Sequence, residues 1–343
     1  MEKRSRSARV FALVGIAALV FSMIAVLIFT QRVGAKRQGE EEPYEVFGFG
    51  KACGRENYLV LGCDKAAGLT DVMMLASVDA RGKSISLLQI PRDTYAVYSE
   101  NGYRKLNGAL SALGVEGLCA FLGENMGVDI DGYFVFGLDT LCEAVDAVGG
   151  VEIELPCDMT YKDAEQGLDI SLKKGKQTLN GAAAEQFVRF RSGYLRGDLG
   201  RIDAQKLFMA ALIRKVKNEL SIQSAIKIAS SLLGKIETNV SLSKLSSLAF
   251  AAFDTDESNI KMATLAGEEH KSRVSGAWFY VLSRVPCQSM MYELFDAQRD
   301  FDENGVFRNE TSSDFERIYK ANVGYEVKNS RDIFENGIEI AKP

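Results

Sequence analysis

Short apolar runs separated by polar turns predict a series of β-strands along this chain. Residues 58–62, 72–78 and 84–90 are apolar runs of strand length, and residues 79–83 form a turn between the last two. We therefore expect a hairpin beside a further buried strand. Later runs predict strands at residues 151–155, 259–264 and 277–282.

Apolar residues that recur every three or four positions predict helices over residues 108–126, 138–148, 180–186, 199–216, 222–233 and 242–253. The polar stretch 158–175 predicts loops or a small hairpin. Because strands and helices alternate in one continuous order, the chain is predicted to form a layered α/β domain.

The N-terminal region carries a different pattern. Residues 10–30 contain no charged side chain and have the length that a helix needs to cross a bilayer. Lysine and arginine flank this run on both sides, and the positive-inside rule favours a cytoplasmic segment 1–9 with the downstream domain extracellular. A cleaved secretory signal is the alternative, since Val33-Gly34-Ala35 resembles a cleavage site. Residues 31–56 have the composition of a linker.

Length and charge limit the classes of function. The chain has 343 residues, 47% of them hydrophobic, which is enough for a large core between residues 57 and 296. Residues 297–343 are charged, and we expect a peripheral C-terminal tail there. A net charge of -5 without broad basic surfaces argues against nucleic acid as a partner.

Cysteine and histidine chemistry is not favoured. The six cysteines show no metal-binding spacing, and the sequence leaves open whether any of them form disulfides. The one histidine, His270, lies in a polar stretch and is expected at the surface, which leaves a Ser-His-Asp or Cys-His mechanism without a base.

An arginine-rich segment is the strongest functional signal. If residues 187–191 are extended, Arg189 and Arg191 point to the same side, and two guanidinium groups on one surface suit a polyanion. Asp198 then opens a helix on which Arg201 and Gln205 share a face. The alternative is a pair of solvated surface arginines beside an ordinary amphipathic helix.

Two carboxylates lie at predicted strand ends. Asp64 closes the first strand and Asp71 opens the second, at the edge where an open α/β sheet usually binds its ligand. Beside arginines, such a pair suits Mg²⁺ that bridges to a pyrophosphate. The alternative is that both residues stabilise turns.

The run Ile90-Pro91-Arg92-Asp93-Thr94 follows the third strand, where the proline must leave the ladder. Asp93 could bind metal, act as a base or orient Arg92, and we favour the last two roles together. Lys105 and Asn107 add a cation and an amide shortly afterwards.

The order of these motifs resembles the LytR-CpsA-Psr family of cell-wall proteins. The matching stretches are LGCD ending at Asp64, LTDVMML around Asp71, IPRDT around Arg92, KLNGA from Lys105, VDAVGGV at 145–151, LNG at 179–181, VRFR ending at Arg191 and DLGRIDAQ ending at Gln205. The resemblance implies a three-layer α/β/α domain with a central mixed sheet and a long apolar pocket for a polyprenyl lipid. It also implies a membrane-anchored transferase that moves a glycopolymer, such as teichoic acid, from a polyprenyl-pyrophosphate carrier to a peptidoglycan acceptor.

By position, the resemblance assigns a role to each candidate. Asp64 and Asp71 would hold Mg²⁺, Asp93 would orient arginine or assist deprotonation, and the remaining groups would bind pyrophosphate: Arg92, Arg189, Arg191, Arg201 and Gln205. This chain has Leu69 and Gln89 where many members have Arg and others Ser. A non-catalytic lipid-pyrophosphate-binding scaffold or regulator, and a polyprenyl-pyrophosphate hydrolase, remain the alternative functions.

Overall fold

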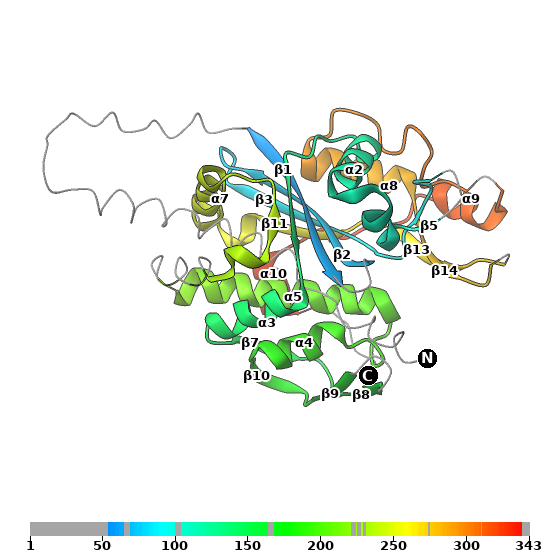
Figure 1. The fold of residues 1–343 in the computed structure, drawn as a ribbon. Helices are drawn as coiled ribbons and strands as arrows, with labels where there is room; N and C mark the ends of the chain where they lie inside the picture. The colour runs from blue at the N-terminus through cyan, green and yellow to red at the C-terminus, as the bar shows by residue number, and fades with distance from the viewer. Residues whose placement is uncertain are drawn as a thin grey trace, which may run out of the picture.

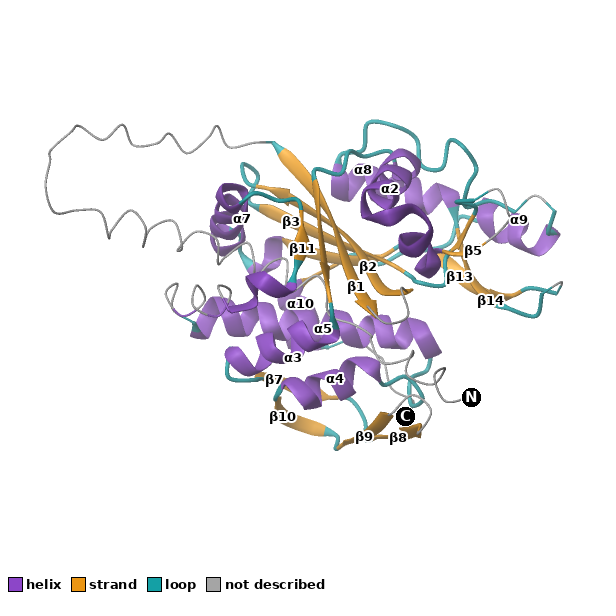
Figure 2. Ribbon diagram, in the orientation of Figure 1, coloured by secondary structure: helices purple, strands orange, loops and turns teal. Residues whose placement is uncertain are grey.

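The computed structural model describes residues 54–64, 69–99, 104–163, 168–220, 224, 228, 231–273, 275–309 and 311–337. A seven-stranded mixed sheet runs through the centre of the protein (Figures 1 and 2). In order across the sheet, its strands are β11 (Glu237–Thr238), β6 (Gly132–Phe136), β1 (Arg55–Asp64), β2 (Leu69–Asp79), β3 (Ser84–Ile90), β12 (Ile260–Thr264) and β15 (Lys328–Asn329). The β1–β6 and β3–β12 pairs are parallel and the other pairs are antiparallel, so the predicted mixed sheet is confirmed.

Helices cover both faces of this sheet. Side chains alternate along β1, so that Tyr58 and Val60 enter the core on one face while Leu59 and Leu61 enter the core on the other. The first core is closed by α3 (Leu138–Ala147), α4 (Gly181–Arg189), α5 (Gly197–Glu219) and α7 (Leu242–Asp254). The second is closed by α2 (Ala109–Met126) and α8 (Arg284–Phe295). Figure 1 shows these two layers above and below the strands.

Smaller elements surround the sheet. They are β4 (Tyr95–Ala96), β5 (Arg104–Lys105), η1 (Leu106–Gly108), β7 (Val151–Leu155), β8 (Met159–Asp163), β9 (Leu168–Leu172), β10 (Gly175–Leu179), η2 (Leu233–Lys235), η3 (Glu257–Asn259), β13 (Gly267–Lys271), β14 (Trp278–Leu282), α9 (Ser313–Lys320) and α10 (Ser330–Asn336). The predicted polar hairpin is confirmed as β8–β9, and β14 pairs with β13 outside the central sheet. The apolar run 10–30 and most of the predicted helix 222–233 lie outside the described residues.

The segment 187–191 is not the extended strand that its sequence predicts. Asn180 accepts a hydrogen bond from the amide of Ala183 and starts α4, which continues to Arg189. Ala184, Phe187 and Val188 share the buried face of this helix, so helical packing overrides the local preference of Phe and Val for strands. Phe190 returns to extended backbone, which separates Arg189 on the helix from Arg191 in the loop after it.

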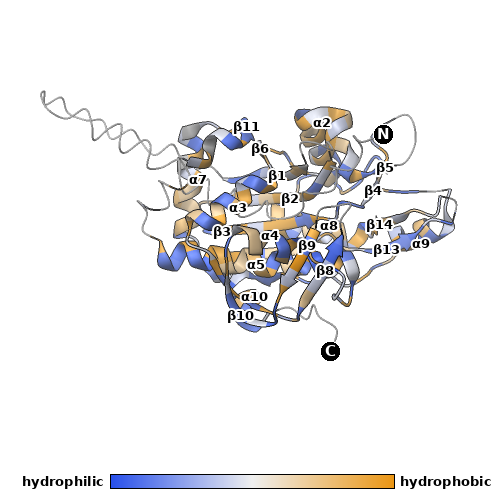
Figure 3. Cartoon of the chain, turned by 60° about the horizontal axis from the view of Figure 1, so that its bottom comes forward, coloured by the Kyte–Doolittle hydropathy of each residue, from blue (hydrophilic) through white to orange (hydrophobic). Residues whose placement is uncertain are grey.

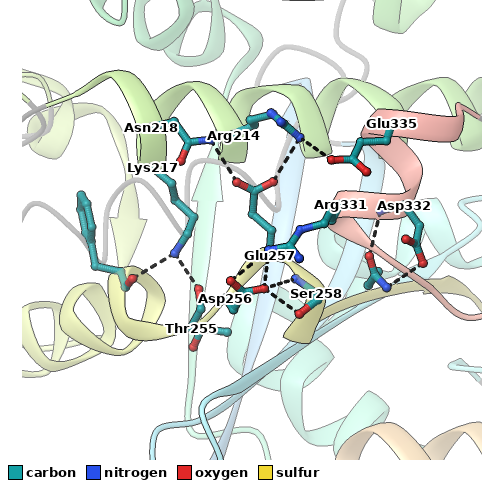
Figure 4. Close-up of polar contacts among 12 residues, drawn as sticks. Arg214, Lys217, Asn218, Thr255, Asp256, Glu257, Ser258, Arg331, Asp332 and Glu335 are labelled. Carbon is teal, nitrogen blue, oxygen red and sulfur yellow. Dashed lines mark hydrogen bonds and ion pairs between the residues drawn. The ribbon is translucent and has the colours of Figure 1, made fainter.

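The C-terminal segment is not peripheral, and the expectation of a tail is wrong for its described part. Phe301 and Phe307 are fully buried beside α2 and α8, and β15 extends the central sheet. Arg331 of α10 pairs with Asp256 at 2.8 Å, while Glu335 lies 3.3 Å from Arg214 of α5 (Figure 4). Charge pairing and burial therefore fasten this segment to the domain.

Helix α2 is unusually apolar. In the described part of the chain, the run Leu106–Met126 is the one helical stretch long and apolar enough to cross a bilayer by length and composition. In Figure 3 much of its ribbon has the orange of hydrophobic residues. Leu118, Leu122 and Met126 are fully buried against the sheet, so the helix is a core element here. Gly114, at φ 70°, interrupts its helical backbone.

Four of the described cysteines are free thiols: Cys119, Cys142, Cys157 and Cys287. Cys53 lies outside the described residues. His270 is half-buried against the ring of Phe315, with its Nε2 3.8 Å from a carboxylate oxygen of Asp314.

Candidate active site

Charged side chains converge where β2 begins and β3 ends. Arg92 follows Pro91 directly after β3, as predicted, and is nearly buried. Its Nη1 donates a hydrogen bond to Asp71 Oδ1 at 3.0 Å, and its Nη2 lies 3.7 Å from Asp198 Oδ1. Burial lowers the pKa of Arg92, but three neighbouring carboxylates outweigh that effect and raise it. Arg92 thus joins β2, β3 and α5 in one charged cluster.

Asp198, in the first turn of α5, is shared by three arginines. Arg201 Nη2 donates to it at 2.9 Å, and Arg92 and Arg191 each approach its Oδ1 to 3.7 Å. Arg201 has only 3% of its side chain exposed, whereas Arg191 has 46% exposed. Burial lowers the pKa of Arg201 to about 10, and although Asp198 opposes this effect, the two other guanidinium groups add to it. Arg92 also contacts Asp71 and Asp93, and Lys105 pairs with Asp93, so four cations face three carboxylates in the described cluster and leave a small excess of positive charge.

Arg189 occupies a different position from the one predicted. Its side chain is 3% exposed and its Nη1 donates to Glu185 Oε1 at 2.7 Å, one turn earlier on α4. Arg191, in contrast, is turned toward Asp198. The strand-based expectation that both point to one surface is therefore wrong, although both lie at the C-terminal end of α4.

Gln205 lies one turn after Arg201 on α5, as the sequence predicts, and is buried. Its Nε2 donates to the backbone oxygen of Val188 at 3.3 Å, and its Oε1 accepts from Gln89 at 2.6 Å. Gln89 of β3 is one of the two positions at which this chain departs from the family pattern. The structure shows that this departure is matched by a buried contact to a candidate site residue.

Asp93 and Lys105 form an ion pair beside Arg92. Lys105 Nζ lies 2.8 Å from Asp93 Oδ1, while Asp93 Oδ2 is 3.9 Å from Arg92 Nε. Asp93 therefore lies between two cations, and its role in orienting Arg92 stays a prediction. Asn107 contributes through its backbone, because its amide donates to Arg92 O at 3.0 Å and its oxygen accepts from Thr70.

Asp71 is aimed by an irregularity in the sheet. Gly62 pairs with Val72 but Cys63 pairs with Thr70, so Asp71 is the extra residue of a β-bulge. Such a bulge redirects a side chain from the regular alternation. The carboxylate is 5% exposed and contacts Arg92. Asp64 is the last residue of β1 and lies close to this bulge in the pairing of β1 with β2. Its side chain lies outside the described part of the structure.

Asp71 fits a magnesium site in the kind of ligand it offers, because magnesium prefers hard oxygen donors and takes few from protein. Among the described residues, no group of three or more histidine, cysteine or acidic side chains is arranged to hold a metal ion. A metal at this position would accordingly depend on Asp71, on Asp64 and on oxygens of the bound substrate.

Sequence reasoning missed several residues that support the cluster. Gln89 and Glu185 contact Gln205 and Arg189, and Asp203 of α5 pairs with Arg196 and with Lys206 at 2.8 Å. The spacing of Asp203 and Lys206 on a helix is a detectable signal. The contact of Gln89 depends on tertiary packing, and that of Glu185 depends on α4 continuing to Arg189, beyond the predicted helix 180–186.

A surface cavity of about 480 Å³ lies along the C-terminal half of α2. Cys119, Val128, Ile130 and Tyr133 contribute apolar surface, and Glu116 adds charge. Asn107 of the candidate site lies just before the start of α2, and the C-terminal half of the same helix lines this cavity. The cavity lies against α2 and β6, away from the strand ends that carry the arginines.

Comparison with known proteins gives this geometry a context. The model of the LytR_cpsA_psr family matches residues 25–296. Over 195 residues the chain is 30% identical to polyisoprenyl-teichoic acid–peptidoglycan teichoic acid transferase TagV of Bacillus subtilis, covering 56% of this chain. It spans about half, 49%, of that relative's length. The corresponding TagU of Oceanobacillus iheyensis is 26% identical, with 77% of this chain and 83% of TagU covered.

Two further likenesses complete the comparison. The regulatory protein MsrR of Staphylococcus aureus is 30% identical over 192 residues, which covers 54% of this chain and 57% of MsrR. The crystal structure of B. subtilis TagV superposes with a TM-score of 0.62 and 24% identity, covering 72% of this chain and 99% of that one. The latter supports the fold alone.

Proposed function

The chain belongs to the LytR_cpsA_psr family, and from this premise we propose that it transfers a glycopolymer from a polyprenyl-pyrophosphate carrier to peptidoglycan. The names of the TagV and TagU relatives, which describe transfer of teichoic acid to peptidoglycan, support this reaction class. The observation that carries the proposal is the sharing of Asp198 by three arginines at the sheet edge.

This arrangement suits a pyrophosphate. Guanidinium groups offer planar pairs of donors that match phosphate oxygens, and together with Lys105 they outnumber the carboxylates of the described cluster by four to three. Arg201 is held almost without solvent, where an electrostatic interaction is stronger than in water. A bound diphosphate would supply the negative charge that Asp198 alone does not.

The reaction needs no protein nucleophile. The acceptor hydroxyl oxygen attacks the phosphorus that carries the glycopolymer, the bridging P–O bond breaks, and polyprenyl phosphate leaves with the bond's electron pair. The hydroxyl proton passes to a carboxylate or water. Arg92 and Arg201 stabilise the charge that grows on the departing phosphate, which lowers the barrier if this contact strengthens in the transition state. Asp93, fixed by Lys105, keeps Arg92 oriented.

Magnesium belongs to the proposal as an untested cofactor. Asp71 and Asp64 would hold it, and the ion would neutralise pyrophosphate charge. Asp71 already contacts Arg92, so Asp71→Asn tests both uses of this carboxylate. A metal role predicts that this variant requires more Mg²⁺ for half-maximal turnover.

The lipid and the membrane complete the proposal. We place the polyprenyl chain along α2, where Leu110, Leu113, Val115 and Phe121 are only partly buried. Segment 10–30 would anchor the chain with its N-terminus in the cytoplasm and the domain outside. Donor and acceptor would then meet at the outer face of the cell membrane, beside the wall.

A turnover assay tests the proposal. The full-length protein in detergent receives Mg²⁺, a short polyprenyl-pyrophosphate-linked saccharide and a peptidoglycan oligosaccharide, and mass spectrometry follows both products. We expect polyprenyl phosphate together with a phosphodiester-linked conjugate. Arg92→Gln should lower this rate at least about 100-fold, the size of a lost charge-assisted contact in a transition state. Arg331→Gln, on distant α10, is the matched control.

The similarity to regulatory protein MsrR supports one alternative, a binding protein without turnover. The same assay separates the possibilities. Tight donor binding without either product would favour a regulator or scaffold. Release of polyprenyl phosphate without a conjugate would favour a hydrolase that uses water as the acceptor, and either result overturns the transferase assignment.

A further inference from the structure

The β13–β14 hairpin brings a second group of side chains to the edge of the arginine cluster. The amide of Tyr280 in β14 donates to the backbone oxygen of Asp93 at 2.8 Å, and Thr94 forms a parallel β-bridge with Tyr280. The hairpin is thus hydrogen-bonded to the loop that carries Arg92. Figure 1 shows it projecting from the domain next to α9.

The two faces of the hairpin have different environments. Phe279 and Val281 pack with Phe315 and Ile318 of α9, with the rings of Phe279 and Phe315 5.7 Å apart. Alternation therefore places Trp278 and Tyr280 on the opposite face. Tyr280 is buried there and its hydroxyl donates to Leu265 O at 2.8 Å. Trp278, the only tryptophan of the chain, is 55% exposed.

Glu269 shares this face. It pairs with Tyr280 across the ladder, and Trp278 pairs with Lys271, so Glu269 and Trp278 are diagonal neighbours. Diagonal side chains on an antiparallel pair lie within roughly 7–8 Å of each other, a distance that an indole can span. Burial raises the pKa of Glu269, and so do Asp198 and Asp93. Glu269 is exposed at the surface and lies within electrostatic range of Asp198 and Asp93.

An exposed indole beside a carboxylate matches the surface of a sugar. The axial C–H groups of a pyranose ring form an apolar patch that stacks on an aromatic face, while its hydroxyl groups donate to a carboxylate. The charge of this face also separates the two substrates. Glu269 and the nearby Asp93 repel the phosphates of a donor, with Lys271 on the same face offsetting part of this charge, and they leave an uncharged glycan unaffected.

We propose that the β13–β14 hairpin binds the acceptor saccharide, with Trp278 stacking on a sugar ring and Glu269 accepting a hydrogen bond from a sugar hydroxyl. This inference rests on the proposed transferase function for its meaning. Donor pyrophosphate occupies the arginine side of the site and the acceptor glycan occupies the hairpin side. Their reacting atoms meet near Asp93, to which the hairpin is bonded.

The single tryptophan provides a binding readout that needs no turnover. Full-length protein is titrated with a peptidoglycan oligosaccharide while its emission is recorded. We expect a saturable blue shift, and Glu269→Gln should weaken the apparent affinity about 10-fold, as expected for a lost hydrogen bond to a charged group. Emission that does not change at millimolar saccharide would overturn the proposal even if transfer activity is present.

Kinetics identify which substrate the hairpin binds. When the acceptor is varied at constant donor, Trp278→Ala should raise the KM for the acceptor at least about 10-fold. When the donor is varied at constant acceptor, the KM for the donor should stay within twofold of wild type. Phe250→Ala, which removes another exposed aromatic side chain, from α7, should leave both constants unchanged. A raised donor KM with an unchanged acceptor KM would assign the hairpin to the donor saccharide and contradict the proposal. If neither substrate turns over, the fluorescence titration still decides the acceptor site.

Discussion

The two ends of helix α5 both carry buried charge, but they satisfy it in different ways. At the N-terminal end, Arg92, Arg191 and Arg201 all depend on Asp198. At the C-terminal end, Arg214 contacts Glu257 and Glu335 (Figure 4). At the first end three arginines share one carboxylate, whereas at the second end one arginine has two.

The C-terminal end also satisfies a cation without any carboxylate. Lys217 Nζ donates to the backbone oxygens of Ala252, Phe253 and Thr255 at 2.6–3.0 Å, at the end of α7. A cation there caps the exposed carbonyls of the helix and interacts favourably with its dipole. This end of α5 is therefore complete within the protein, and its charges stabilise the fold.

The difference between the two ends of α5 indicates where a ligand is required. Bringing guanidinium groups together and removing them from water costs free energy, which a bound anion offsets. Such a cost is expected at functional sites, where groups are positioned for a ligand rather than for stability. Substitutions at the two ends of α5 should therefore have opposite effects on ligand binding and on stability.

The largest effect is expected from Arg201→Gln. Donor affinity should fall at least about 100-fold, equivalent to about 3 kcal/mol at the stated factor of ten per 1.4 kcal/mol, because two or more charge-assisted contacts are lost. Thermal stability should stay equal or rise, since the repulsion from Arg92 and Arg191 is relieved. Calorimetric titration and a melting curve measure both. A large fall in Tm would show that Arg201 is mainly structural.

Glu257→Gln should have the opposite pattern. Glu257 Oε2 lies 3.8 Å from Arg214, its Oε1 accepts from Asn218, and the side chain is nearly buried. We expect the free energy of unfolding to fall by about 2 kcal/mol, since a buried ion pair loses one charge while Arg214 keeps Glu335. Denaturant unfolding measures the loss, and pyrophosphate binding should be unchanged. Weaker binding would mean that the two ends are coupled.

Asp302 has a buried carboxylate, which accepts hydrogen bonds from the Tyr319 hydroxyl at 2.8 Å and from the Phe307 amide. Burial raises its pKa to about 6. Because the folded protein holds this proton more tightly than the unfolded chain does, the free energy of unfolding should fall as pH rises from about 4 to about 6. The contribution is on the order of 2 kcal/mol. Asp302→Asn should flatten this part of the stability–pH profile, and an unchanged profile would contradict it.

Lys217→Met should give the smallest change. The variant keeps much of the side-chain volume but leaves three carbonyl oxygens without the ammonium group. We expect a loss of about 1 kcal/mol, typical of a helix-capping contact, and local opening of α7. Hydrogen exchange of the α7 amides locates the effect. Faster exchange throughout the molecule would indicate a global rather than a local role.

The sequence predicted β1, β2, β3 and β12 because apolar runs and turn residues determine them locally, but it missed β6, which lies beside β1 in the sheet. It predicted Arg201 and Gln205 on one helical face for the same reason, since helical spacing alone relates them. The position of Arg92 after β3 followed from Pro91, which cannot continue a strand.

The failures share a physical cause. Residues 187–191 have strand-forming side chains, but α4 packs them into a helical core, and only tertiary structure decides between the two. The charged C-terminal segment hides a few fully buried aromatic residues among polar ones. Likewise, the contact between Gln89 and Gln205 joins β3 to α5 and has no local signal.

The most direct test of the account is whether the N-terminal end of α5 binds a diphosphate lipid. The full-length protein in detergent is melted with geranylgeranyl pyrophosphate, with geranylgeraniol and without ligand, at two salt concentrations. We expect geranylgeranyl pyrophosphate to raise the Tm and geranylgeraniol to leave it unchanged. The rise should be smaller at high salt and absent in the double variant Arg92→Gln plus Arg201→Gln. An equal rise in that double variant, or none in the wild-type protein, would contradict the claim that the arginine excess exists for this ligand.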